Sequence, residues 1–335
     1  MPLVDPSTVL PLGVSLDFFT DTGFWSGVGV IAGVYALVAL GLQLNVGFTG
    51  IVNFGAAGFM AVGAYSMAIL VLKVGLSFWL AMPLAVLITM GFGLLIGLPA
   101  LRLRADYLAI ATIAMAEIVR VVAQNARGLT GGNQGLFCNE GGRCFDDTWF
   151  SISSTMEGWL ENLGWSDPPS LVPLLVVVWA VVLLVTVGLR FIQGSPWGRV
   201  LRAIREDEDA ARALGKNAFA YKLQSLVISA AIGAVAGFFL ALDLATIHPV
   251  DYEPLVTFFG YSVLVLGGLA SYWGVMAGSV ILWAILEGTR FVDLPIEEVQ
   301  ITAVRFALVG LLLILIMAFR PQGMFGKREE MMLGE

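Results

Sequence analysis

The hydrophobic pattern divides the chain into long apolar segments separated by short polar ones. A helix crosses about 30 Å of hydrocarbon with about 20 apolar residues, and its internal hydrogen bonds satisfy the backbone there. The pattern therefore predicts an all-α polytopic membrane protein with about nine transmembrane helices, in a range of about eight to ten. The predicted spans are 24–46, 51–72, 78–100, 106–124, 171–192, 223–245, 256–270, 275–289 and 301–319. The seventh and eighth are short and glycine-rich, so they are expected as either full crossings or half-helices.

The positions of lysine and arginine predict the orientation of these spans. Basic residues gather in segment 193–222, in the loop of Arg102 and Arg104, and in tail 320–335, whereas acidic residues dominate segment 125–170. Because cytoplasmic loops are enriched in basic residues, the first three regions are expected in the cytoplasm. Segment 125–170 and the N-terminal segment 1–23 are then external. An odd number of spans, with the N-terminus outside and the C-terminus inside, satisfies every assignment.

Composition supports a single membrane domain over residues 1–335. Hydrophobic residues make up 58% of the chain and charged residues 13%, against about 25% charged in soluble domains. A net charge of −7 argues against nucleic acid as a partner, because phosphate contacts need clustered lysine and arginine. Cys138 and Cys144 are a candidate disulfide if their loop is external. With two cysteines and one histidine, no metal site is predicted.

Glycine pairs spaced by four recur within the predicted spans. Small residues one helical turn apart let neighbouring helices approach closely in lipid. The spacing favours tight bundle packing, with a sliding surface as the alternative. The pairs are Gly29/Gly33, Gly93/Gly97, Gly233/Gly237 and Gly274/Gly278.

Two segments combine polar residues and glycines near membrane depth. Segment 44–58 contains Asn45, Thr49, Gly50 and Asn53, and segment 267–274 contains Gly267, Gly268 and Gly274. Interrupted helices in the two halves of a transporter point to its solute path. The first group is therefore a candidate translocation path, and an ordinary cytoplasmic turn is an equally weighted alternative.

The basic segment 193–222 also contains a predicted short helix. Four acidic residues at 206–209 precede Ala-Ala-Arg-Ala-Leu-Gly, which suits a helix with acids at its positive end and glycine after its last turn. Two interpretations of this capped helix are open. It is either a docking element for a soluble partner or an ordinary loop helix that faces solvent. The candidate docking residues are Arg205, Glu206, Asp209, Ala210, Ala211, Leu214 and Gly215.

The sequence lacks the phosphate-binding loop Gly-x-x-x-x-Gly-Lys-Ser/Thr, so ATP-driven work would need another subunit. The spans also lack a nucleophile–base pair. The chain is therefore predicted to be neither an enzyme nor the holder of a cofactor.

Several sequence blocks together resemble the LivM family of bacterial ABC-importer permeases. Asp209-Ala210-Ala211-Arg212-Ala213-Leu214-Gly215 is similar to the coupling motif, with Asp in place of Glu. The likeness continues in blocks 129–136, 198–208, 221–223, 265–274 and 320–323.

The resemblance implies a permease subunit of an importer for branched-chain or other neutral amino acids in the bacterial inner membrane. It implies a second, LivH-like permease, two ATPase subunits that bind ATP and Mg²⁺, and an external solute-binding protein. Residues 209–215 would then belong to the coupling helix. A urea-importer permease of the same family and an ion-coupled secondary transporter are the alternatives.

Overall fold

The computed structural model describes residues 21–138, 142, 144–162, 164–165, 168–269, 271–289, 298–320 and 322–325. Within these residues the chain is helical and forms only isolated β-bridges. Nine helices correspond to the predicted spans: α1 (Thr22–Leu42), α2 (Ala56–Leu72), α3 (Phe78–Ala100), α4 (Ala105–Asn125), α7 (Val172–Gly194), α10 (Ala218–Leu244), α11 (Pro254–Gly267), α12 (Tyr272–Gly288) and α13 (Glu298–Phe319). The predicted segment 1–23 and tail 320–335 lie largely outside the described residues.

Shorter helices occupy the connections. They are the π-helix η2 (Gln43–Thr49), α5 (Arg127–Thr130), η3 (Gly132–Gln134), α6 (Asp147–Asn162), α8 (Pro196–Glu206), α9 (Glu208–Ala213) and the 3-10 helix η4 (Pro249–Tyr252). Segment 125–170 is thus partly helical.

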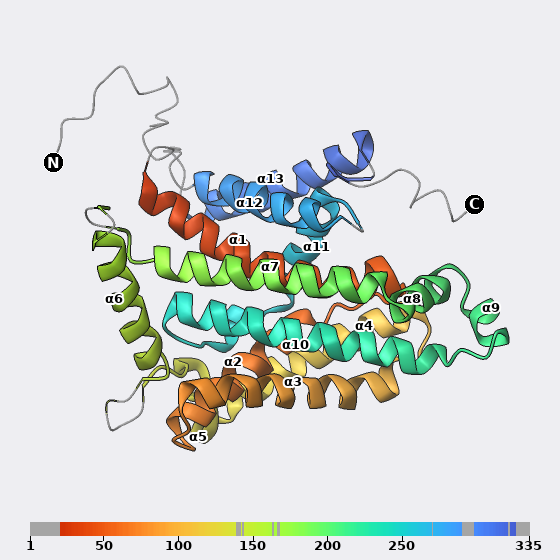
Figure 1. Cartoon of the computed structure of the whole chain (residues 1–335), viewed down its shortest axis with the longest axis horizontal. Helices are drawn as coiled ribbons and strands as arrows, with labels where there is room; N and C mark the ends of the chain where they lie inside the picture. Colours follow the sequence, from red (N-terminus) through yellow and green to blue (C-terminus); the bar gives the residue numbers. More distant parts are fainter. Residues whose placement is uncertain are drawn as a thin grey trace.

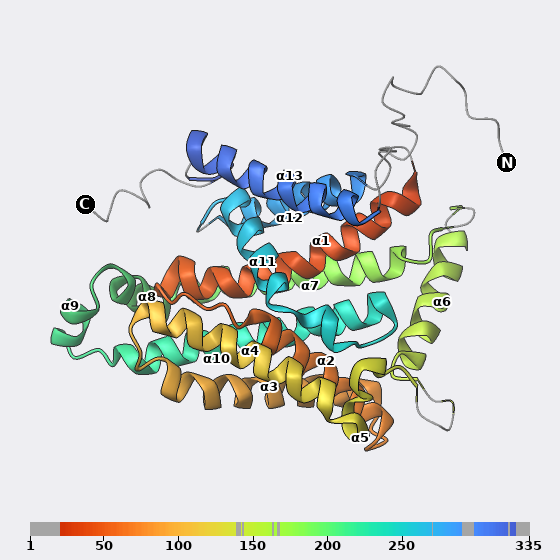
Figure 2. The same cartoon turned by 180° about the vertical axis from the view of Figure 1, so that it is seen from behind.

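The long helices form a bundle in which successive helices alternate in direction. α1, α3 and α7 run toward the end that carries α8 and α9, whereas α4 and α10 run toward the end that carries α5 and α6 (Figure 1). The loop of Arg102 and Arg104, the α8–α9 segment and the end of α13 all lie at the same end, and α5 and α6 lie at the other (Figure 2). The regions that the charge pattern assigns to opposite sides of a membrane therefore lie at opposite ends of the bundle.

Four helical segments in the described part of the chain are individually long and apolar enough to cross a membrane. They are Thr22–Thr49, Phe78–Ala100, Val172–Gly194 and Ala218–Leu244. α11 and α12 form a fifth candidate, bent by 118° at its break, and α2 and Ala303–Phe319 are shorter apolar helices. The fold is therefore that of a multi-pass membrane protein.

α10 and α1 form the centre of the bundle. In the most apolar stretch of each helix, 78% of the residues are buried in α10 and 83% in α1 with η2. The buried share is 33% in α3 and 39% in α7. α10 packs against α1, α2 and α3. Lipid-facing surface is thus concentrated on the outer helices.

The glycine pairs lie at these helix contacts. Gly33 faces Val178 of α7, Gly93 faces Ala230 of α10, and Gly237 lies against the Met60 backbone of α2. Gly274 lies against Gly267, where α11 and α12 meet. These close approaches confirm the packing interpretation.

The prediction that a helix begins at residue 51 is wrong. Residues 50–55 are not helical, and α2 begins at Ala56. This segment runs from the α8 end back into the bundle before α2 starts (Figure 2). The physical reason is that side chains from other helices provide hydrogen bonds for its backbone, so helical pairing is not required.

We expect Gly237→Val to destabilise the protein, because its Cβ would overlap the Met60 carbonyl of α2. Overpacking typically costs about 1–3 kcal/mol. Thermal unfolding in detergent should show a lower Tm for this variant. Gly91→Val on α3 is the matched control, since no atom lies within 4 Å of its added Cβ. Equal Tm values for the two variants would contradict the assigned contact.

Candidate functional site

The predicted short helix exists as α9, and both of its ends are capped. The Asp207 side chain accepts a hydrogen bond from the Ala210 N–H at 2.9 Å. At the other end the Gly215 N–H donates to Arg212 O at 2.9 Å and the Lys216 N–H donates to Ala211 O at 3.1 Å. This pair of bonds is a Schellman motif, in which Gly215 adopts φ +76°, a conformation that favours glycine.

The outer surface of α9 is small and partly apolar. Ala211 turns inward and packs with Ile204 and Ala218. Asp209 and Ala210 are exposed, and Leu214 is 81% exposed. Leu214 is thus an exposed apolar side chain on a capped helix at one end of the bundle (Figure 1).

Arg205 and Glu206 do not share this surface. Both lie in the last turn of α8. The Arg205 guanidinium donates to the Gly47 carbonyl in η2, and its side chain lies against Gly50. Arg205 therefore connects the α8–α9 segment to the first membrane helix.

A second connection joins α9 to the core helix α10. Glu208 forms ion pairs with Arg212 and with Lys222. Lys222 lies three residues, or about one helical turn, before Ser225 on α10.

Ser225 is the centre of a buried polar cluster with η2. Its Oγ lies 2.8 Å from Thr49 Oγ1 and donates to Asn45 Oδ1 at 3.2 Å. Gly50 ends η2 with φ +72°, a value that favours glycine. The structure thus brings Asn45, Thr49 and Gly50 together where the first helix is interrupted, and π-helical turns are frequent at functional sites.

Asn53 lies in a different environment, in the extended segment that precedes α2. Its backbone N–H and carbonyl both contact the Tyr261 hydroxyl of α11, at 3.1 and 2.9 Å. The next N–H, of Phe54, donates to Thr112 Oγ1 of α4 at 3.0 Å, and the Ala57 N–H donates to Thr257 Oγ1 at 3.0 Å. Side chains of α4 and α11 therefore replace helical hydrogen bonds here.

Two amide groups in this region have no hydrogen-bond partner within the described part of the chain. They are Asn45 Nδ2 and Asn53 Nδ2, both in fully buried side chains. Buried polar groups are normally paired, so each of these two donors still requires an acceptor. Asn53 lines a small cavity with Gly55, Gly58 and Thr112.

The sequence did not single out Ser225, Tyr261, Thr112 or Thr257. Each is an isolated polar residue in an apolar helix, and isolated serine and threonine residues are ordinary in membrane helices. Their clustering depends on tertiary packing.

The second glycine-rich segment pairs with residues that follow α13. The Met324 and Phe325 N–H groups donate to Leu266 O and Gly267 O at 3.0 and 3.1 Å. Gly323 also packs against Gly268, so residues of blocks 265–274 and 320–323 are in contact at the end of α11. On its other side Arg190 lies 6.0 Å from the Tyr272 ring and 5.8 Å from the Trp273 ring.

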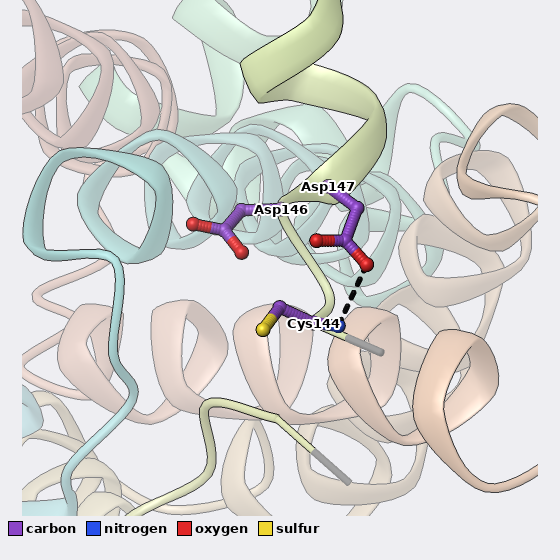
Figure 3. Close-up of side chains that lie close together, drawn as sticks. All are labelled: Cys144, Asp146 and Asp147. Carbon is purple, nitrogen blue, oxygen red and sulfur yellow. Dashed lines mark hydrogen bonds between the residues drawn. The ribbon is translucent and has the colours of Figure 1, made fainter. Parts of the chain in front are cut away.

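The two cysteines lie at the α6 end. Cys138 and Cys144 are joined by a disulfide with a Cα–Cα distance of 4.0 Å. Cys144 also lies near Asp146 and Asp147, and its backbone N–H donates to Asp147 Oδ2 at 2.7 Å (Figure 3). Burial raises the pKa of the Asp146 carboxyl. Because a disulfide sulfur is not a thiolate ligand, this cluster is a turn that begins α6.

Residues 26–317 match a family described as branched-chain amino acid transport system / permease component. The chain is 33% identical to the high-affinity branched-chain amino acid transport system permease protein LivM of Salmonella typhimurium, covering 97% of this chain and 77% of that protein. It is 26% identical to a probable LivM of Methanocaldococcus jannaschii, covering 94% of this chain and 95% of that protein. It is 29% identical to the permease protein LivH of Salmonella typhimurium, covering 90% of this chain and 94% of that protein. No solved structure matches the chain.

A match over most of the chain, together with the interrupted helices of a multi-pass bundle, establishes the relationship. The chain therefore belongs to the family of branched-chain amino acid transport system permease components, which are membrane transport subunits and not enzymes.

Proposed function

We propose that this chain is the permease subunit of an ATP-driven importer of branched-chain or other hydrophobic neutral amino acids in the bacterial inner membrane. The observation that carries the proposal is similarity to LivM over 97% of the chain. The LivM and LivH relatives are described as permeases for branched-chain amino acids, which favours these solutes over urea.

A LivH-like protein is the proposed partner within the membrane. LivH and LivM relatives both align with at least 90% of this chain, so the two permeases share one fold. Two such subunits, each with a similar bundle, form a pseudo-symmetric pair around one route. This chain then supplies half of the translocation pathway, and Asn45, Thr49, Gly50 and Asn53 are its proposed contribution.

Two ATPase subunits are proposed at the α8–α9 end, and a solute-binding protein at the α6 end. ATP and Mg²⁺ would bind to the ATPases. α9 presents Asp209, Ala210 and Leu214 outward. Its contacts with α10 and, through α8, with η2 provide a physical connection from the ATPase to the buried polar cluster.

The proposed topology has nine crossings, with the α8–α9 end in the cytoplasm. Arg102, Arg104 and the arginines of α8 all lie at that end (Figure 1), and basic residues are retained on the cytoplasmic side. The disulfide loop then faces the oxidising exterior.

The function is tested by purifying the tagged chain from its native membrane in mild detergent. We expect a second permease and ATPases with phosphate-binding loops to be recovered with it. In proteoliposomes this complex should take up leucine only with internal ATP and the external binding protein. Uptake by the chain alone, driven by an ion gradient, would instead establish a secondary transporter. Selective ATP-dependent uptake of urea would support the other alternative.

We expect Gly215→Trp to abolish uptake while membrane insertion stays normal, because the variant adds bulk to the docking surface and strains a positive φ. Gly164→Trp is a matched control: it also has a positive φ, at 95°, and no atom within 4 Å, but it lies just after α6. The readouts are leucine uptake and the amount of ATPase that co-purifies. Normal uptake by Gly215→Trp would refute the role of α9 in coupling.

The topology is tested by cysteine labelling in right-side-out vesicles. An impermeant maleimide should label Cys138 and Cys144 only after an impermeant reductant has opened the disulfide. In a Cys138→Ser/Cys144→Ser background, Leu214→Cys should be labelled only after the membrane is permeabilised, since Leu214 is 81% exposed on the proposed cytoplasmic side. Labelling of Leu214→Cys in intact vesicles would reverse the proposed orientation.

A further inference from the structure

Three charged side chains meet where α4 passes the start of α11. Arg120 Nε donates to Glu117 Oε2 at 2.9 Å, and a second guanidinium nitrogen contacts the other oxygen of the same carboxylate. Arg120 Nη1 also lies 3.9 Å from Glu253 Oε1. We refer to Glu117, Arg120 and Glu253 as the ionic triad.

The ionic triad lies at membrane depth and not at the end of the bundle. α2 and α4 run in parallel: a Cβ at Gly55 would lie 3.0 Å from Thr112 O, and one at Gly58 would lie 2.9 Å from Ala116 Cα. One more turn along α4 places Arg120 level with about residue 62 of α2. α2 continues to Leu72, so roughly 15 Å of helix extends beyond the triad on the α6 side.

At this depth the surface that carries the triad must face protein or water. Glu117 and Glu253 are 39% and 44% exposed on the isolated subunit, and Arg120 is 19% exposed. Ionised side chains in contact with lipid are costly and normally face a bundle interior or a water-filled cavity. This side of α4 therefore faces protein or a water-filled space in the assembled importer, and not lipid.

Neighbouring groups add polar and apolar contacts of the kind that an amino acid requires. Thr112, Ala116 and Arg120 are spaced by four and share one face of α4, which continues to the cavity lined by the unpartnered Asn53 amide. Leu255 and Phe258, in the first turns of α11, are exposed. The surface thus combines charges of both signs with apolar side chains, and the unpaired Asn53 amide is buried behind it.

A free amino acid has a carboxylate and an ammonium group, and both need opposite charges and hydrogen bonds when they leave water. We propose that the ionic triad is the head-group subsite for the amino acid in transit. Arg120 binds the α-carboxylate through Nη1, because its Nε and Nη2 already donate to Glu117. Glu253 and Glu117 accept the α-ammonium, and Leu255 and Phe258 contact the apolar side chain. This inference rests on the proposed function.

The test uses the complete importer in proteoliposomes, with leucine uptake and ATP hydrolysis measured on the same preparation. We expect Arg120→Gln and Glu253→Gln to lower leucine uptake per ATP by about tenfold, the scale of one lost contact to a charged group. ATPase stimulation by the liganded binding protein should change little. Asp106→Asn, in the first turn of α4, is the matched control and should transport normally.

A charge exchange separates a solute contact from a structural ion pair. Glu117→Arg/Arg120→Glu retains an i,i+3 pair on α4 but moves the guanidinium away from its place beside Glu253. We expect uptake to remain low in this double variant. Restored uptake, or a parallel loss of ATPase stimulation and uptake in every variant, would show a structural role and overturn the subsite. If the wild-type importer transports leucine and the single variants are equally active, the subsite is overturned and the proposed function stands. If the wild-type importer takes up no amino acid, the proposed function is overturned as well.

Discussion

The structure depends on one constraint, which is that no backbone polar group at membrane depth can be left without a hydrogen-bond partner. The chain departs from α-helical pairing at residues 50–55 and again at 245–253, and both departures are compensated by specific groups. Tyr261, Thr112 and Thr257 pair with the first segment. In the second, Ile247 exchanges backbone hydrogen bonds with Leu136, and the Asp251 carboxylate accepts from the His248 N–H. The polar side chains of otherwise apolar helices therefore lie where the backbone needs them.

These two departures give the bundle a pair of shorter helices of opposite direction. α2 starts inside the bundle and runs toward the α6 end, whereas α11 starts inside it and runs toward the α8 end (Figure 2). Their first turns meet through the Ala57–Thr257 hydrogen bond, beside the packed rings of Phe54 and Phe258. Helix N-termini carry partial positive charge, and in transporters such interrupted helices surround the solute path. The first turns of α2 and α11, and with them the positive ends of both helices, thus meet inside the bundle.

The exposed end and the buried interruptions are linked by short contacts. Glu208 of α9 pairs with Lys222 of α10, and one turn later Ser225 contacts Thr49 in η2. Arg205 of α8 donates to Gly47 in the same π-helix. A displacement of α9 would therefore act on η2 through both α8 and α10. Such a two-way linkage is the physical connection that the proposed coupling to ATPase subunits requires.

The sequence by itself determined the membrane class, the positions of the helices and the opposite placement of the basic and acidic connections, because hydropathy and charge act locally along the chain. It also located α9, whose acidic start and glycine end are local capping signals, and the glycine pairs that allow close helix contacts. Tertiary structure alone decided that residues 50–55 stay extended, since the compensating side chains come from α4 and α11. It also decided that Ser225 joins Asn45, that Arg205 contacts η2, and that Glu253 approaches Arg120. The physical reason is that a single polar residue in an apolar helix carries no periodic signal, and only packing of distant helices defines its partners.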